Sequence, residues 1–271
     1  RGKKGLGETL REAGTVAIHG LDTRALVRHL RSLGAMRGAV STEHVDEAER
    51  ARLLARVLEQ PRMTGAALAL EVGTRIPHAW GAHAAGRPRV AALDYGIKRN
   101  ILRKLAARGL DVTVFPPTTP AAGLLGFDGY FLSNGPGDPA ALPSCVETIR
   151  ALVDTGKPVF GICLGHQLLG LALGARTFKL KFGHRGVNHP VKDLATGAVS
   201  ITSQNHGFAV DPGSLPAGLE LTHVNLNDGT CEGFRLAGRP VFAVQYHPES
   251  APGPHDSDPL FDEFTRALAP A

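Results

Sequence analysis

Short apolar runs alternate with amphipathic stretches along most of the chain beyond residue 89. The runs have the length and residue types of buried strands, and the stretches between them carry apolar residues at helical spacing. Such an alternation predicts an α/β fold in which a mixed, mostly parallel sheet is flanked by helices. We expect strands at residues 90–93, 112–115, 129–133 and 159–162, helices at 99–107, 146–154 and directly after 163, further strands at 199–202, 219–222, 231–236 and 241–246, and a last helix at 259–268.

The first sixty residues hold fewer elements. The pattern predicts a strand at 15–18, a helix at 23–33, a strand at 35–40 and a charged helix at 43–60. These are too few to close a layered domain, so we interpret them as the remnant of a smaller N-terminal domain. Residues 61–88 are rich in Gly, Ala and Pro and predict a linker with one short strand. The predicted division is therefore 1–60, 61–88 and 89–271.

Composition excludes several classes of protein. Of the 271 residues, 43% are hydrophobic and 20% charged, as in ordinary globular proteins, and no apolar run approaches the ~20 residues that cross a bilayer. The net charge of +5 is scattered and aromatics are only 6%, which disfavours a nucleic-acid partner. Three widely spaced cysteines fit a reducing compartment, so we expect a cytoplasmic protein with no membrane partner.

The segment Gly161-Ile-Cys163-Leu-Gly165 joins a predicted strand to a predicted helix. Small residues on both sides of a nucleophile allow the sharp turn that projects it toward a substrate. The start of the following helix favours the thiolate, which is the reactive form of cysteine. The sequence therefore predicts that Cys163 is a nucleophile.

A base for this cysteine is offered further along the chain. The run at 241–246 ends at His247, Pro248 stops the strand, and Glu249 follows two positions after the histidine. If the two strands are neighbours, His247 takes the thiol proton while Glu249 orients the ring and stabilises the imidazolium ion. We therefore predict a triad of Cys163, His247 and Glu249.

Each residue of this predicted triad could also have a purely structural role. A lone cysteine in an apolar run is more often a small core residue, but the order and placement of all three residues favour catalysis. A zinc site is disfavoured because no Cys-x-x-Cys pair accompanies Cys163 and His166. We predict no metal site.

These motifs together resemble the class I glutamine amidotransferases, which split glutamine at a cysteine and deliver ammonia to a second active site. Further segments narrow the resemblance to the small, glutamine-hydrolysing subunit of carbamoyl phosphate synthetase, and they extend it over essentially the whole chain. The segments are Leu93-Asp-Tyr-Gly-Ile-Lys-Arg-Asn-Ile-Leu102, Leu132-Ser-Asn-Gly-Pro-Gly-Asp-Pro139, Phe182-Gly-His-Arg-Gly-Val-Asn-His-Pro-Val191, Ser203-Gln-Asn-His-Gly-Phe-Ala-Val210 and Pro252-Gly-Pro-His-Asp256. The fold implied is flavodoxin-like.

Glutamine must be held as well as attacked. Attack on its side-chain amide places negative charge on the carbonyl oxygen, for which the N–H of Leu164 and the loop containing Gly135 are candidate donors. The resemblance implies further residues around the amino acid: Gly137, Gln167, Asn205, Gly207 and Phe208. A helix-surface position for Gln167 and a core position for Phe208 are the alternatives.

The resemblance implies the overall reaction. Glutamine is hydrolysed through a cysteine thioester to glutamate and ammonia, and the ammonia passes to a large synthetase subunit that makes carbamoyl phosphate from bicarbonate for arginine and pyrimidine biosynthesis. The chain contains no Walker-type phosphate loop. We therefore expect no cofactor here, ATP and Mg on the large subunit, and a heterodimer that is open to higher assembly. By the same resemblance, residues 1–60 are the closing portion of an N-terminal domain that the sequence largely lacks.

Two other functions stay open. One is a stand-alone glutaminase or γ-glutamyl hydrolase with the same triad, against which the resemblance outside the triad argues. The other is an inactive fragment that only supports the large subunit, which the incomplete N-terminal domain makes plausible.

Overall fold

The computed structural model describes residues 4–43 and 46–269 and divides the chain into two units, Arg1–Arg62 and Met63–Ala271. Among the described residues, no helix is long and apolar enough to cross a membrane.

The first unit consists of short helices joined by irregular segments. Aspartates start two of its helices, because the Asp22 carboxylate accepts from the N–H of Ala25 and that of Asp46 from the N–H of Glu49. None of the helical residues is buried. The helices are α1 (Leu6–Glu12), α2 (Thr23–Leu33) and α3 (Glu47–Glu59).

Two sequence predictions for this unit are wrong. Residues 15–18 and 35–40 do not form strands, because a strand needs a partner for its backbone N–H and C=O groups and the described part of this unit contains none. The charged helix predicted from residue 43 begins at Glu47 instead, after its cap; residues 44 and 45 lie outside the described residues.

The second unit is built on one ten-stranded sheet, whose order is β1-β3-β2-β4-β5-β10-β9-β8-β6-β7. Strands β3, β2, β4, β5 and β10 are mutually parallel, and the strands beyond them on both sides pair antiparallel. The expected mixed sheet is confirmed. The strands are β1 (His78–Trp80), β2 (Arg89–Leu93), β3 (Asp111–Phe115), β4 (Gly129–Leu132), β5 (Val159–Ile162), β6 (Thr177–Asp193), β7 (Val199–Val210), β8 (Leu219–Asn225), β9 (Cys231–Leu236) and β10 (Val241–Val244).

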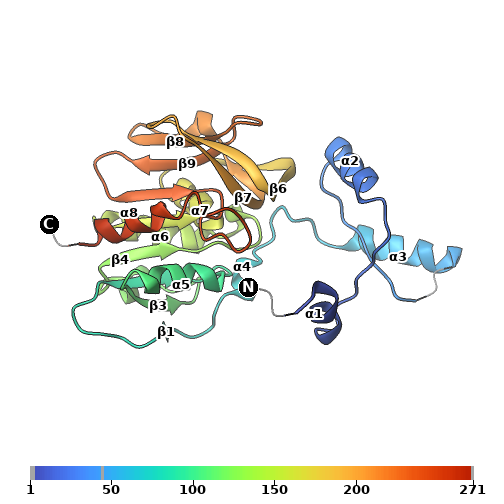
Figure 1. The fold of residues 1–271 in the computed structure, drawn as a ribbon, viewed down its shortest axis with the longest axis horizontal. Helices are drawn as coiled ribbons and strands as arrows, with labels where there is room; N and C mark the ends of the chain where they lie inside the picture. The colour runs from blue at the N-terminus through green and yellow to red at the C-terminus, as the bar shows by residue number, and fades with distance from the viewer. Residues whose placement is uncertain (1–3, 44–45, 270–271) are drawn as a thin grey trace. The chain divides into compact units, whose positions relative to one another are not determined.

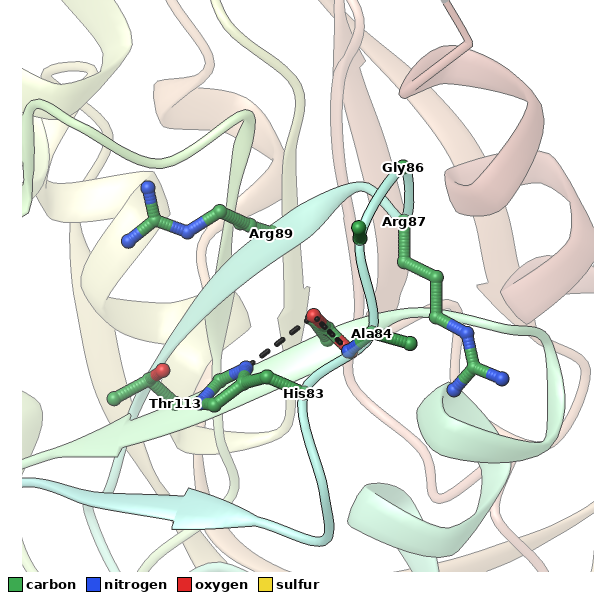
Figure 2. A pocket seen from close by; sticks show the side chains of 8 residues that line it. His83, Ala84, Gly86, Arg87, Arg89 and Thr113 are labelled. Carbon is green, nitrogen blue, oxygen red and sulfur yellow. Dashed lines mark hydrogen bonds and ion pairs between the residues drawn. The ribbon is translucent and has the colours of Figure 1, made fainter.

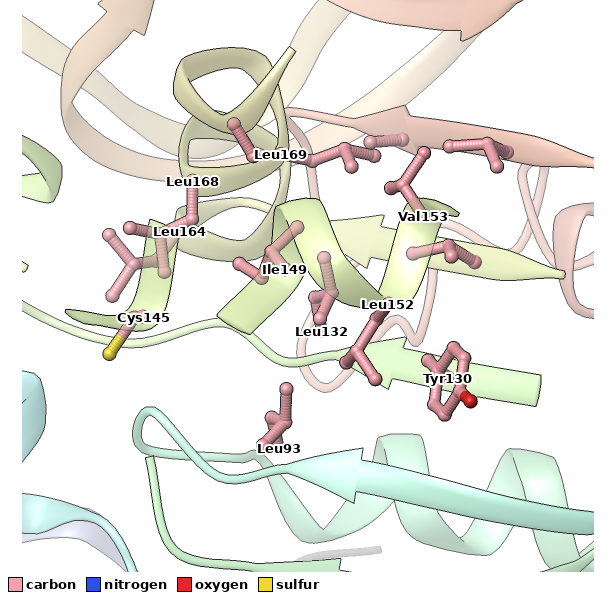
Figure 3. Close-up of a cluster of buried hydrophobic side chains, with 14 of the residues drawn as sticks. Leu93, Tyr130, Leu132, Cys145, Ile149, Leu152, Val153, Leu164, Leu168 and Leu169 are labelled. Atoms are coloured by element: carbon pink, nitrogen blue, oxygen red, sulfur yellow. The ribbon is translucent and has the colours of Figure 1, made fainter. Parts of the chain in front are cut away.

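Helices cover both faces of the parallel strands (Figure 1). On one face, leucines of α6 and α7 pack on Leu93, Tyr130 and Leu132 (Figure 3). On the other, α5 and α8 pack on the alternate strand residues, with Phe131 and Phe160 at the centre. The helices of this unit are α4 (Ala69–Val72), α5 (Arg99–Ala107), α6 (Pro143–Asp154), α7 (Leu164–Ala172) and α8 (Pro259–Ala267), with 3-10 turns η1 (Ala121–Leu124), η2 (Pro139–Ala141) and η3 (Pro212–Ser214).

The long hairpin of β6 and β7 is the largest difference from the sequence prediction. Residues 177–193 carry glycines and charged residues in place of a clean alternation, and the register shifts twice along the pair. Such irregular strands lack the period-2 signal on which sequence prediction depends. The hairpin matters because β7 carries three of the residues expected to bind glutamine.

Candidate active site

Cys163 stands between β5 and α7 in a conformation that few residues adopt. Its φ of 54° and ψ of −101° lie outside the regions open to most side chains, a strain of about 1–3 kcal/mol. Close packing around this turn requires a glycine on both sides of Cys163. A Cβ on Gly165 would lie 2.2 Å from the carbonyl oxygen of Leu132, and one on Gly161 would lie 2.9 Å from the Gly165 backbone. The predicted sharp turn at the nucleophile is therefore present.

The parallel pairing of β5 with β10 brings His247 to this cysteine. Ile162 is paired with Val244, and the N–H of Cys163 donates to the carbonyl of Val244 at 2.9 Å. Beyond β10, the N–H of His247 is bound to the carbonyl of Ser203 at 2.9 Å. The His247 ring is then within hydrogen-bonding reach of the Cys163 side chain.

Glu249 completes the arrangement. The Nδ1 of His247 lies 2.8 Å from its Oε1, and both residues are buried. Burial alone would lower the pKa of His247, but the charges of Glu249 and Cys163 and hydrogen bonds to both raise it to about 10. Burial would raise the pKa of Glu249, but the charge and hydrogen bond of His247 outweigh it and lower it to about 2. The arrangement thus favours an imidazolium ion at His247 beside an ionised Glu249.

Lys98 is a member of this site that the sequence analysis did not identify. Its Nζ lies 2.6 Å from Oε1 of Glu249, and the side-chain amide of Asn100 donates to the Glu249 carbonyl. Both residues fall within segment 93–102, one of the segments that carry the family resemblance. No motif spacing could have linked them to Glu249, because about 150 residues of chain separate the partners.

The loop after β4 lies beside the elbow at the carboxyl end of the sheet. The Asn134 Oδ1 accepts from the N–H of Lys98 at 3.0 Å, which joins this loop to the start of α5. Glycine at 135 is demanded by the fold, since a Cβ there would lie 2.0 Å from the Tyr95 carbonyl oxygen. Gly137 has a φ of 106°, and a Cβ there would lie 2.6 Å from the Ala66 carbonyl oxygen. The loop is thus held rigidly by its neighbours.

The remaining predicted residues lie on α7 and β7. The N–H of Leu164 is the first of α7 and so has no partner within the helix. Gln167 is buried, not on a helix surface, and its amide donates to the Phe208 carbonyl at 2.7 Å and to Oε1 of Gln245 at 3.0 Å. Asn205 is exposed and Phe208 is buried. A Cβ on Gly207 would meet nothing closer than 3.8 Å, so packing does not require a glycine at this position. The missing side chain leaves open space beside the backbone.

His166 and the other cysteines do not join the site. His166 is fully buried, its Nε2 lies 3.8 Å from Sγ of Cys231, and burial lowers its pKa to about 3. Burial raises the pKa of Cys145 to about 11 and that of Cys231 to about 12, so both thiols stay protonated at neutral pH. They are core residues.

A cavity of about 370 Å³ lies at the opposite edge of the sheet, at the amino ends of β2 and β3 (Figure 2). Asp111 is the only carboxylate that lines it, and it is already bound to the N–H of Ala84 at 3.1 Å and to His83 at 3.3 Å. The residues that line the cavity include no nucleophile facing a base.

Two protein families match the chain. Residues 91–267 match the family described as glutamine amidotransferase class-I, and residues 1–40 match the family described as carbamoyl-phosphate synthase small chain, CPSase domain. The first match contains the whole triad and every predicted glutamine-binding residue. The second falls within the Arg1–Arg62 unit.

Curated relatives align with nearly the full chain. A carbamoyl phosphate synthase small chain of Thermosynechococcus vestitus is 51% identical, over 99% of this chain and 73% of the relative. One of Solidesulfovibrio magneticus is 54% identical, over 96% of this chain and 72% of the relative.

Among solved structures, the chain resembles a putative GMP synthase protein from Thermoplasma acidophilum. The TM-score is 0.60 at 23% identity, over 69% of this chain and 96% of that one. A glutamine amidotransferase of Thermotoga maritima gives a TM-score of 0.50 at 18% identity, over 62% and 77%. At these identities the likeness concerns the fold.

Proposed function

The chain belongs to the carbamoyl phosphate synthase small chains and carries their class I glutamine amidotransferase domain, and on this basis we propose that Cys163, His247 and Glu249 hydrolyse its glutamine. It is the glutaminase component of the synthase. The observation that carries the assignment of residues is the strained Cys163 at the start of α7, within reach of a histidine whose far nitrogen is bound to a buried carboxylate.

The first half of the reaction forms a thioester. The Cys163 thiolate attacks the side-chain amide carbon of glutamine, and the N–H of Leu164 stabilises the negative charge that develops on the oxygen. The imidazolium of His247 gives its proton to the leaving nitrogen as the C–N bond breaks. Ammonia departs, and a γ-glutamyl thioester remains on Cys163.

The second half returns the enzyme to its starting state. Neutral His247 takes a proton from a water molecule, which attacks the thioester carbon. The C–S bond breaks, glutamate leaves, and Cys163 is again a thiolate beside imidazolium. Glu249 keeps the Nδ1 proton of His247 in place throughout, so that only Nε2 exchanges protons with the reactants.

The glutamine-binding roles extend the same proposal. Gly135 and Gly137 present the backbone of the rigid loop after β4 to the substrate. The side-chain amide nitrogen of Gln167 is bound within the protein, so its carbonyl oxygen can accept from the amino group of the substrate. Asn205, Gly207 and Phe208 supply the β7 side of the pocket. The open space at Gly207 supports this placement.

The ammonia is consumed on another polypeptide. Membership of the small-chain family implies a large synthetase partner, and we place ATP and Mg there because this chain has no phosphate-binding loop. We further propose a heterodimer, open to higher assembly, in which ammonia is channelled between the subunits. Three free cysteines are consistent with a cytoplasmic enzyme.

Replacement of the nucleophile tests this function. With the large subunit present, Cys163→Ser should reduce glutamine-dependent carbamoyl phosphate synthesis by about a thousandfold or more, because a serine hydroxyl is far less ionised than a thiol. Synthesis from added ammonia should be retained, which shows that the complex is intact. Glutamine-dependent synthesis near the wild-type rate would remove Cys163 as nucleophile.

The same assay separates the alternatives. A stand-alone glutaminase would turn over at the same rate with and without the large subunit. An inactive supporting fragment would hydrolyse no glutamine under either condition.

A further inference from the structure

Three strands bring two histidines and a glutamate together behind the glutamine-binding segment. His184 of β6 and His206 of β7 are direct cross-strand partners, and Glu232 belongs to β9. All three are buried, and one nitrogen or oxygen atom from each lies within 4.8 Å of the others. The sequence predicts no metal site, because these residues are far apart along the chain and only the antiparallel strands unite them.

His206 has a buried ring nitrogen with no hydrogen-bond partner in the part of the chain that the structure describes. Its Nδ1 lies 2.7 Å from the Phe208 carbonyl oxygen, which can only accept, so Nδ1 carries the ring proton. In a neutral ring with its proton on Nδ1, Nε2 presents a lone pair. That Nε2 is buried and has no hydrogen-bond partner among the described residues. A histidine whose far nitrogen donates to a backbone carbonyl is the usual form of a metal ligand.

His184 is oriented in the same way by a carboxylate. Its Nε2 lies 2.8 Å from Oδ2 of Asp228, which fixes the proton on Nε2 and turns Nδ1 toward Glu232. Nδ1 lies 3.5 Å from Oε1 of Glu232 and 3.5 Å from Nδ2 of Asn225.

Glu232 is positioned by two side-chain amides. Asn225 donates to its Oε1 at 2.8 Å and Gln204 to its Oε2 at 2.8 Å. Each oxygen retains a lone pair, because a carboxylate oxygen can accept twice. The carboxylate is thus fixed and only partly satisfied.

We propose that His184, His206 and Glu232 bind a divalent transition-metal ion, for which Zn²⁺ is the probe. Imidazole nitrogen and carboxylate oxygen are both zinc ligands, and a tetrahedral ion at bonds of ~2.1 Å holds its ligand atoms roughly 3.4 Å apart. The Nδ1 of His184 and Oε1 of Glu232 are already 3.5 Å apart. His206 Nε2 closes the remaining distance on binding. The Nδ1 of His189 is also buried without a partner in the described chain, and its ring centroid lies 5.2 Å from that of His184.

The ion would stabilise the antiparallel half of the sheet. It would join β6, β7 and β9 at one point, directly behind Asn205 and Gly207, which flank His206 in the sequence. Its role is therefore structural and concerns the wall of the glutamine pocket.

The experiment uses the full chain with Cys163→Ser, so that zinc bound by the active-site thiolate does not contribute. After chelator treatment and gel filtration, this protein is titrated with ZnCl₂ by calorimetry, and the retained zinc is measured by elemental analysis. We expect about one zinc per chain and a rise in melting temperature with zinc. Adding Glu232→Gln should abolish both. Adding Asp228→Asn, which removes only the carboxylate behind His184, should weaken zinc binding about 10–100-fold. Adding His78→Gln, at an exposed histidine on β1 at the other end of the sheet, should change neither.

Two results overturn the proposal. If the Cys163→Ser chain retains no zinc and shows no saturable heat, His184, His206 and Glu232 bind no zinc ion; this outcome does not depend on the folding of any further variant. If Glu232→Gln retains as much zinc as its parent, the ion is bound elsewhere on the surface.

Discussion

Lys98 and His247 share one carboxylate oxygen. Oε1 of Glu249 lies 2.6 Å from the Lys98 Nζ and 2.8 Å from the His247 Nδ1, so the cation that precedes α5 and the His247 ring donate to the same acceptor. Lys98 is partly exposed, whereas Glu249 is fully buried. The lysine therefore keeps a buried glutamate ionised while reducing the negative charge that His247 experiences.

Replacement of Lys98 should impair catalysis more than substrate binding. In Lys98→Met, Glu249 loses one of its two cationic partners, its pKa rises, and the ring is held less firmly. We expect kcat for glutamine hydrolysis to fall about tenfold with a smaller change in KM, which corresponds to ~1.4 kcal/mol. The acid limb of the kcat profile should move to higher pH.

The neighbouring arginine is the matched control for this change. Arg99 is exposed and also cationic. Arg99→Met should leave kcat and its pH profile within about twofold of the wild type, because its charge is screened by solvent. If both variants behave alike, loss of net charge explains the effect and Lys98 has no particular role.

The glycine after the nucleophile should tolerate no side chain. In Gly165→Ala, the new Cβ would lie 2.2 Å from the Leu132 carbonyl oxygen, a backbone atom that cannot rotate away. We expect a loss of about 1–3 kcal/mol in the free energy of unfolding and loss of glutaminase activity, because the turn must move. In Gly123→Ala the nearest atom is 3.7 Å away, in Thr119, and both properties should be retained. Full activity in Gly165→Ala would show that the elbow is more pliable than its geometry indicates.

The buried triad should make stability depend on pH in one direction. The pKa of His247 is raised in the folded state, from 6.5 to about 10, so its contribution is complete below pH 6.5 and is lost as pH rises through about 10. Urea unfolding of the wild type and of His247→Gln, from about pH 6 to about pH 10, measures this. The difference in free energy of unfolding between the wild type and His247→Gln should shrink steadily across that interval. A difference that grew with pH would mean that the folded histidine is neutral.

Trypsin should cleave the Arg1–Arg62 unit before it cleaves the Met63–Ala271 unit. Its helices bury no residue, and apolar side chains such as Ile18, Leu26 and Leu58 are 58%, 49% and 61% exposed. Segments with so few buried contacts open locally at little cost. Limited trypsin digestion should therefore cut within this unit at least about ten times faster than within Met63–Ala271 and leave the sheet intact, as mass spectrometry would show. Equal rates of cleavage in both units would contradict this expectation.

The triad was predictable because local signals specify it. Glycines around Cys163 and a proline after His247 mark where strands end, and parallel strands bring their carboxyl ends to the same edge of the sheet. The pairing of β5 with β10 could not be predicted, since periodicity identifies a strand and not its neighbour. The role of Lys98 was missed for the same reason.

Sequence patterns predict strands that do not form and miss one that does, because strand formation depends on a neighbouring strand to pair with. Residues 15–18 are apolar enough for a strand but find none to pair with in the described part of their unit, whereas the polar β6 is held in place by β7 and β8. Pairing overrides the propensity of a single segment. The cluster of His184, His206 and Glu232 was invisible for the same reason, because it exists only once these strands are adjacent.

The ladder between β5 and β10 has a consequence for how the enzyme moves. Hydrogen-bonded strands are held about 4.8 Å apart, and here the ladder continues to the N–H of Cys163 itself, in the interior of a ten-stranded sheet. The backbone of Cys163 can therefore separate from that of Val244 only if the sheet itself comes apart. The amide hydrogen of Cys163 should exchange with solvent as slowly as global unfolding allows, while surrounding loops exchange freely.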